Sequence, residues 1–123
     1  SDPMTEYMNT RWYRAPEVVL SPGKYGKAQD VWSAGCTFAE VLIRTPLFPG
    51  RSTVDQLQVI INTLGTPTPE DLEFEMKPKS RKYVSKLKSR NIGLHKALFD
   101  AYVIHPNLFD LLKDMLKFNP YHR

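Results

Sequence analysis

The sequence predicts a mainly α-helical protein, and three observations support this prediction. Apolar residues recur at helical spacing over residues 30–44, 53–64 and 106–118. Proline and glycine lie between these stretches, where helices end. No stretch alternates between polar and apolar residues as a half-buried strand does. The 123 residues, 41% of them hydrophobic, are enough for one compact unit.

The first elements are an ordered loop and a long helix. Residues 1–28 are rich in proline and glycine and are predicted to form a loop with one short helix after Pro16. Nearly every position over residues 30–44 is apolar, which predicts a helix that is buried on all sides. Asp30 would cap its N-terminus or face the positive end of the helix dipole. Pro46 ends it.

Four shorter helices are expected to follow. The first is capped at Ser52 or Thr53, and Gln56 would complete a capping box with Thr53. The next starts after Thr68, with Pro69 at its first position. The third has a weaker apolar pattern and includes Tyr83, Val84 and Leu87. The last begins near Pro106 and is expected to bury Leu108, Leu111, Leu112, Met115 and Leu116.

Composition excludes several classes of protein. No apolar run approaches the roughly 18 residues that cross a membrane, so no membrane partner is expected. The single cysteine, Cys36, cannot form an internal disulfide and is interpreted as a buried structural thiol. No histidine or cysteine cluster has metal-ligand spacing, so no metal site is predicted.

The segment Thr5-Glu6-Tyr7-Met8-Asn9-Thr10-Arg11-Trp12-Tyr13-Arg14-Ala15-Pro16-Glu17 is the most informative part of the chain. Phosphorylation of Thr5 or Tyr7 would add about −1.5 to −2 charges and three acceptor oxygens. Arg11 and Arg14 carry planar guanidinium groups that suit such a phosphate. Their three-residue spacing lets both reach one phosphate from a turn. The segment is therefore predicted to be a loop that phosphorylation orders.

This segment resembles the activation segment of mitogen-activated protein kinases of the extracellular-signal-regulated, Thr-Glu-Tyr subgroup, and Ala-Pro-Glu is a kinase landmark. The resemblance continues through three further stretches and covers nearly all of residues 4–123. They are Asp30-Val31-Trp32-Ser33-Ala34-Gly35-Cys36, then Pro46-Leu47-Phe48-Pro49-Gly50 with Leu64-Gly65-Thr66-Pro67, and Met115 to Arg123.

The resemblance implies a fragment of the helical C-terminal lobe of a protein kinase. Residues 1–3 are interpreted as a cloning remnant, 4–28 as activation segment and substrate loop, and 29–123 as lobe core with an insert at about 66–105. The chain has no glycine-rich phosphate loop, no His-Arg-Asp and no Asp-Phe-Gly. The fragment alone is therefore expected to hold no catalytic residue, to bind no cofactor and to be inactive. ATP and magnesium are implied for the parent kinase.

The family implies a role for each residue of the segment. Thr5 and Tyr7 resemble the two sites phosphorylated by an upstream dual-specificity kinase, and Arg11 and Arg14 resemble partners of the phosphotyrosine. Thr10 resembles the threonine that contacts the absent catalytic loop. Thr10, Arg11, Trp12, Tyr13 and Arg14 look like the wall of the pocket for the proline that follows the target Ser or Thr. Ordinary core packing is the alternative for Trp12 and Tyr13.

Further residues resemble structural anchors and a docking groove. In kinases the glutamate that matches Glu17 pairs with an arginine at the position of Arg123, and the aspartate that matches Asp30 accepts hydrogen bonds from the catalytic loop. The groove for Phe-containing motifs maps onto Val19, Leu20, Thr53, Val54, Leu57 and Tyr83. Thr53 replaces the usual aromatic residue, and Val19 and Val54 are smaller than usual. The alternative is that Val54 and Leu57 only pack inward. Residues 98–106 also depart from the family's shorter link.

Three functional hypotheses remain open. The first is a part of a proline-directed Ser/Thr kinase in cytoplasm or nucleus, with an upstream kinase, Ser/Thr-Pro substrates and phosphatases as partners. The second is a non-catalytic docking module or phosphorylation substrate. The third is nucleic-acid binding by the basic run at 77–90, for which a solvated helix face is the favoured interpretation. A fragment alone is also expected to self-associate through bare apolar surface.

Overall fold

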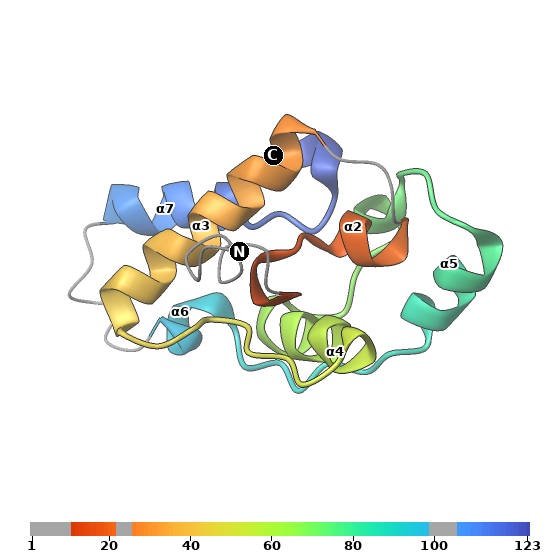
Figure 1. Cartoon of the computed structure of the whole chain (residues 1–123), viewed down its shortest axis with the longest axis horizontal. Coiled ribbons are helices and arrows are strands. Elements are labelled where there is room, and N and C mark those ends of the chain that lie inside the picture. Colours follow the sequence, from red (N-terminus) through yellow and green to blue (C-terminus); the bar gives the residue numbers. More distant parts are fainter. Residues whose placement is uncertain (1–10, 22–25, 99–105) are drawn as a thin grey trace, which may run out of the picture.

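The longest helix, α3 (Lys27–Ile43), runs obliquely through one half of the molecule (Figure 1). The structure is a computed structural model that describes residues 11–21, 26–98 and 106–123. Within these ranges it is helical and contains no strand, which confirms the mainly α prediction. The other elements are η1 (Arg11–Tyr13), α2 (Pro16–Leu20), α4 (Thr53–Leu64), η2 (Glu70–Leu72), α5 (Pro78–Ser85), α6 (Leu94–Ala97), α7 (Pro106–Met115) and η4 (Pro120–His122).

Helix α3 begins earlier than the sequence predicted. Its N-cap is Gly26 and its first residue is Lys27, so Asp30 is not the cap. Asp30 instead lies exposed in the first turn, where its negative charge is stabilised by the positive end of the helix dipole. Arg44 ends the helix in the left-handed conformation, at φ 68°, and donates its N–H to the Glu40 carbonyl.

One side of α3 is buried and the other is bare. Trp32, Cys36 and Ala39 face the core, and α7 packs along the helix. At Gly35 an added Cβ would lie 3.1 Å from Leu116 and Met115, so the missing side chain lets α7 approach. Phe38 and Val41 are 42% and 67% exposed. The prediction of burial on all sides was therefore wrong for this chain, whereas the bare apolar surface expected of a fragment is present.

The N-terminus of α4 is capped by Ser52 rather than Thr53. The Ser52 Oγ accepts the Asp55 N–H at 3.1 Å, and the Asp55 carboxylate accepts the Arg51 N–H at 2.8 Å. Gln56 takes no part in a capping box, since it turns into the core and is fully buried. The capping role proposed for Gln56 was wrong because its apolar-stripe position on α4 directs it inward.

The remaining elements differ from the prediction mainly in extent. Thr68 and Asp71 form a reciprocal pair of hydrogen bonds, and the turn they start is the short 3-10 element η2. Helix α5 ends before Leu87, and the four-residue α6 was not predicted. Leu111 of α7 is 51% exposed instead of buried, because the core lies on the side of Leu112.

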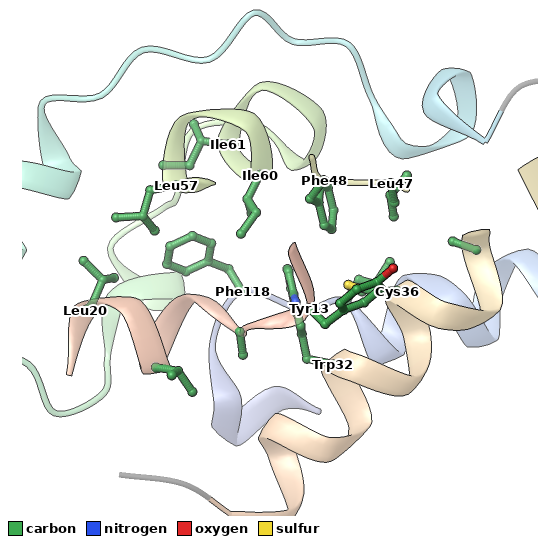
Figure 2. Close-up of a cluster of buried hydrophobic side chains, with 14 of the residues drawn as sticks. Tyr13, Leu20, Trp32, Cys36, Leu47, Phe48, Leu57, Ile60, Ile61 and Phe118 are labelled. Carbon is green, nitrogen blue, oxygen red and sulfur yellow. The ribbon is translucent and has the colours of Figure 1, made fainter. Parts of the chain in front are cut away.

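The core forms where α2, α3 and α4 meet the loop between α3 and α4 (Figure 2). The rings of Trp32 and Phe48 stack with centroids 5.5 Å apart. Leu57 and Ile60 of α4 and Phe118 close the cluster. The described part of the chain has no helix long and apolar enough to span a membrane, and it has no group of three or more His, Cys, Asp or Glu residues arranged for a metal ion.

Cys36 is expected to be inert in the folded protein. It is 1% exposed, and burial raises the pKa of its thiol far above the usual range, so the reactive thiolate is absent at neutral pH. We expect a chromogenic disulfide reagent to modify Cys36 at least about a hundredfold more slowly in the native state than in denaturant. Equal rates in the two states would show that the thiol is accessible in the fold.

Candidate functional site

The segment from Arg11 to Tyr13 is attached to the loop between α3 and α4 through one carbonyl. The Trp12 indole Nε1 donates to the Gly50 carbonyl at 2.8 Å, and the Arg11 Nη1 donates to the same oxygen at 3.3 Å. Trp12 is half-buried and packs against the core. The position of both side chains therefore depends on the position of Gly50.

Gln56 holds that loop in place from helix α4. Its Oε1 accepts the Gly50 N–H at 3.0 Å, and its Nε2 donates to the Phe48 carbonyl at 2.9 Å. An added Cβ at Gly50 would lie 2.6 Å from the Gln56 Cα, so only glycine allows this close approach. The buried Gln56 amide thus fixes the position of the loop to which Trp12 is bonded.

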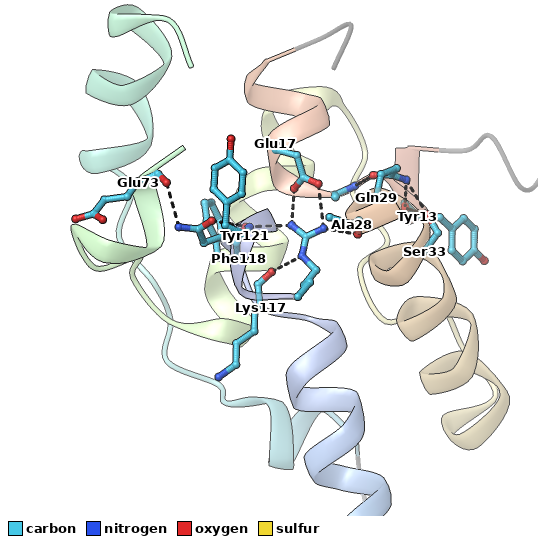
Figure 3. Close-up of polar contacts among 12 residues, drawn as sticks. Tyr13, Glu17, Ala28, Gln29, Ser33, Glu73, Lys117, Phe118 and Tyr121 are labelled. Atoms are coloured by element: carbon cyan, nitrogen blue, oxygen red, sulfur yellow. Dashed lines mark hydrogen bonds and ion pairs between the residues drawn. The ribbon is translucent and has the colours of Figure 1, made fainter. Parts of the chain in front are cut away.

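Polar groups on one face of α3 hold the next residues. The Tyr13 ring is 2% exposed, and its hydroxyl donates to the Glu40 carboxylate. The Tyr13 carbonyl accepts the Ser33 hydroxyl at 2.7 Å, and Gln29 accepts the Ala15 N–H at 2.7 Å (Figure 3). Three side chains of α3 therefore hold the backbone and side chain of Tyr13 and the backbone of Ala15 in place.

An ion pair closes the far end of the segment. The Arg123 Nη1 lies 2.9 Å from Glu17 Oε2, and its Nη2 pairs with Glu17 Oε1. Arg123 Nη1 also donates to the Ala28 carbonyl at 2.7 Å (Figure 3). Its Nε donates to the Lys117 carbonyl and its Nη2 to that of Phe118.

Arg123 is placed so that all five of its N–H donors find acceptors. Its side chain is fully buried, that of Glu17 is 10% exposed, and the guanidinium lies 5.2 Å from the centroid of the Trp32 ring. A buried bidentate pair of this kind joins α2 to the start of α3 and to the segment after α7. It connects residues that are 106 positions apart.

The six residues of the predicted docking groove lie on α2, α4 and α5, and they do not share one environment. Leu20 and Leu57 are buried in the core and Val19 is half-buried. Val54 is 59% exposed and Tyr83 is 37% exposed, while Thr53 is exposed as well. Leu57 therefore packs inward, as its alternative interpretation held, whereas Val54 does not.

The protein kinase domain family matches this chain over residues 1–123. The chain belongs to that family. It is 49% identical over 121 residues to mitogen-activated protein kinase 4 of Oryza sativa, and 48% identical over 120 residues to the homolog NTF3 of Nicotiana tabacum. It is 47% identical over 117 residues to the kinase spk1 of Schizosaccharomyces pombe. These similarities confirm the resemblance to mitogen-activated protein kinases.

The chain spans about a third of the length of these kinases. The matches cover 98%, 98% and 95% of this chain but 32%, 32% and 31% of the respective relatives. The activity and partners of these relatives are therefore properties of proteins about three times as long as this chain.

Some of the predicted kinase-family residues can be placed and others cannot. Thr5, Tyr7 and Thr10 lie outside the described residues. Arg11 and Arg14 share one turn, in which the Arg14 N–H donates to the Arg11 carbonyl at 3.1 Å. Arg14 is exposed, whereas Arg11 is half-buried against Gly50. Their role as phosphate ligands remains a prediction.

Several residues that hold the segment and its loop were not predicted from the sequence. Gln29, Ser33 and Glu40 hold the segment, and Gln56 holds its loop. Their common signal is a polar side chain at a position where helical periodicity directs it inward. Gln29 and Ser33 are four residues apart on one face of α3, which is the only sequence pattern that could have suggested a shared partner.

Proposed function

We propose that this chain is the regulatory and substrate-facing part of the C-terminal lobe of a proline-directed Ser/Thr protein kinase. The complete kinase transfers the γ-phosphate of ATP, with magnesium, to Ser or Thr residues that precede proline. Phosphorylation of both Thr5 and Tyr7 by an upstream dual-specificity kinase switches it on, and phosphatases reverse the switch. The protein acts in the cytoplasm, the nucleus or both.

The observation that carries this proposal is the double attachment of the segment after Thr10. Its start is bonded to Gly50 through Arg11 and Trp12, and its end is anchored by Glu17 and Arg123. A substrate-binding wall must be positioned to a fraction of an ångström to exclude wrong residues. These attachments support a rigid wall directly after the phosphorylation sites.

The same segment is proposed to select proline. Proline lacks an N–H and has a restricted φ, so a pocket without a carbonyl acceptor at that point accepts it without leaving a buried donor unpaired. In this chain the Gly50 carbonyl is already occupied by the Trp12 indole and by Arg11. This occupancy supports a wall that offers no partner to the N–H of other residues.

A second contact with substrates involves the docking surface, which consists of Val19, Leu20, Thr53, Val54, Leu57 and Tyr83. Its exposed apolar members, Val54 and Tyr83, offer apolar area to an aromatic side chain of a partner. Burial of that area contributes roughly 25 cal/mol per Å². We assign Phe-containing motifs of protein substrates to this surface.

The test uses the full-length protein that contains this chain. We expect the doubly phosphorylated protein to phosphorylate a Ser-Pro peptide at least about tenfold faster than the Thr5→Ala or Tyr7→Phe variant treated with the same upstream kinase. Thr45→Ala, an exposed threonine on the loop after α3, is the matched control and should be activated normally. A peptide with alanine in place of proline should be a poor substrate. Equal activity of all variants would contradict the proposed switch.

A non-catalytic docking module is the second candidate, because Val54 and Tyr83 of the docking surface are exposed. The phosphorylation assay together with a binding assay for Phe-containing peptides separates the two functions. A full-length protein that binds Phe-containing peptides but never transfers phosphate would favour the docking module.

A further inference from the structure

Helix α5 and its flanks carry seven basic residues and no acidic residue between positions 77 and 90. One of them is structural, since the Arg81 guanidinium donates to the Leu72 carbonyl at 2.6 Å and to the Phe74 carbonyl at 3.0 Å. The other six are exposed, and none forms an ion pair with an acid of the described residues. They are Lys77, Lys79, Lys82, Lys86, Lys88 and Arg90.

Two of these lysines, Lys79 and Lys82, share the outer face of α5 with Tyr83, and Lys86 follows directly after the last residue of the helix. Val84 is fully buried and directs the opposite face of the helix to the core. Lys79 precedes Tyr83 by four residues and Lys86 follows it by three, so both are its neighbours on the helix surface. Lys82 lies beside them, three residues after Lys79. We call Lys79, Lys82 and Lys86 the basic strip.

The basic strip is held in place at both ends of α5. Before the helix, the Ser21 hydroxyl at the end of α2 donates to the Glu75 carbonyl. After it, Gln58 Nε2 of α4 donates to the Lys88 carbonyl at 2.8 Å, and the Ile92 N–H donates to the Asn62 carbonyl at 2.8 Å. Figure 1 shows α5 at the edge of the molecule, beyond α2 and α4. The strip is therefore presented on a helix that α2 and α4 both restrain.

We propose that the basic strip binds an acidic peptide segment of a protein partner, next to the aromatic residue that the docking surface receives. The proposal rests on the docking function proposed above, and it adds a charge requirement to it. Tyr83 belongs to both surfaces, so one bound peptide would contact the apolar surface and the lysines together. The partner would carry Asp or Glu residues within a few positions of its phenylalanine.

The surroundings of the strip favour a peptide over a nucleic acid. Single-stranded nucleic acids are bound by rows of aromatic side chains that stack with successive bases. Tyr83 is the one aromatic residue in the basic run. The other exposed apolar member of the docking surface, Val54, is aliphatic. A peptide with one aromatic residue and acidic residues beside it would place the ring on the apolar surface and its carboxylates near the lysines.

The effect is measurable because three rim ion pairs act together. A single exposed ion pair changes affinity by a factor of about 1.4 to 5, so three pairs are expected to change it by a factor of about 3 to 100. Screening by salt should reduce the difference, because all the lysines are exposed to solvent.

The experiment measures binding of labelled peptides to the full-length protein by fluorescence anisotropy. One peptide carries phenylalanine with three flanking glutamates, and its partner carries glutamines instead. The variant Lys79→Glu with Lys82→Glu and Lys86→Glu removes the strip. The control Lys27→Glu with Lys96→Glu and Lys113→Glu changes three exposed lysines on α3, α6 and α7 and has the same net charge.

We expect the acidic peptide to bind at least about threefold more tightly than the neutral one, and this preference to vanish in the strip variant but not in the control. Equal binding of both peptides by the unmodified protein would overturn the proposal, whatever the fold of the variants. Equal loss in strip variant and control would also overturn it, since net charge would then be the cause. Tighter binding of a single-stranded oligonucleotide of equal charge would assign the strip to nucleic acid. Each of these results leaves the phosphate-transfer test untouched.

Discussion

Replacement of Arg123 by alanine is expected to lower the free energy of unfolding by about 3–5 kcal/mol, because it leaves the Glu17 carboxylate buried without its partner. The same change removes donors from the carbonyls of Ala28, Lys117 and Phe118. It also removes the cation that lies over the Trp32 ring. The loss therefore combines an unpaired charge with several lost hydrogen bonds.

The measurement is urea unfolding of the protein and its variants, followed by circular dichroism. Arg51→Ala is the matched control, since Arg51 is exposed and should change stability by less than about 0.5 kcal/mol. Arg123→Lys keeps the charge but not the planar donors, so an intermediate loss is expected. If Arg123→Ala unfolded at the same urea concentration as Arg51→Ala, the ion pair would have no net role in stability.

Replacement of Gln56 by leucine is expected to destabilise the fold by about 2–4 kcal/mol, because two buried hydrogen bonds to the loop are lost. The Gly50 N–H and the Phe48 carbonyl would keep only the tight-turn bond between them, at 3.0 Å. Leucine is close to glutamine in size, so the loss reflects the polar contacts rather than a cavity. Because Trp12 is bonded to Gly50, the substrate wall should shift as well.

Two variants on the same helix sharpen this prediction. Val54→Ala changes an exposed position and should be nearly neutral in stability. Gln56→Glu keeps an acceptor for Gly50 but places an oxygen opposite the Phe48 carbonyl, so we expect it to be destabilising too. Urea unfolding measures the stability of all three, and the KM for a Ser-Pro peptide in the full-length protein reports the shift of the wall. A stable Gln56→Leu protein with an unchanged KM would show that the loop holds its own position.

Local sequence was sufficient for the three longest helices because their signals are local. Apolar spacing in α3, α4 and α7 and the turn at Thr68 and Asp71 were all recognisable from the chain. The first residues of α3 and α4 were not, because polar residues near Gly26 and Ser52 are equally plausible caps in the sequence. The exposure of Leu111 and Phe38 also depends on which face meets another element.

The sequence by itself determined the family and the order of its parts. The segment from Thr5 to Glu17 carries a pattern specific enough to indicate a kinase, and to suggest a partner for Glu17 at Arg123. Only the tertiary structure decided how the segment is held. The Gly50 carbonyl, the Gln56 amide and the Ser33 hydroxyl act through contacts between residues 6 to 39 positions apart. Hydrogen bonds at such separations depend on helix packing, which no local pattern encodes.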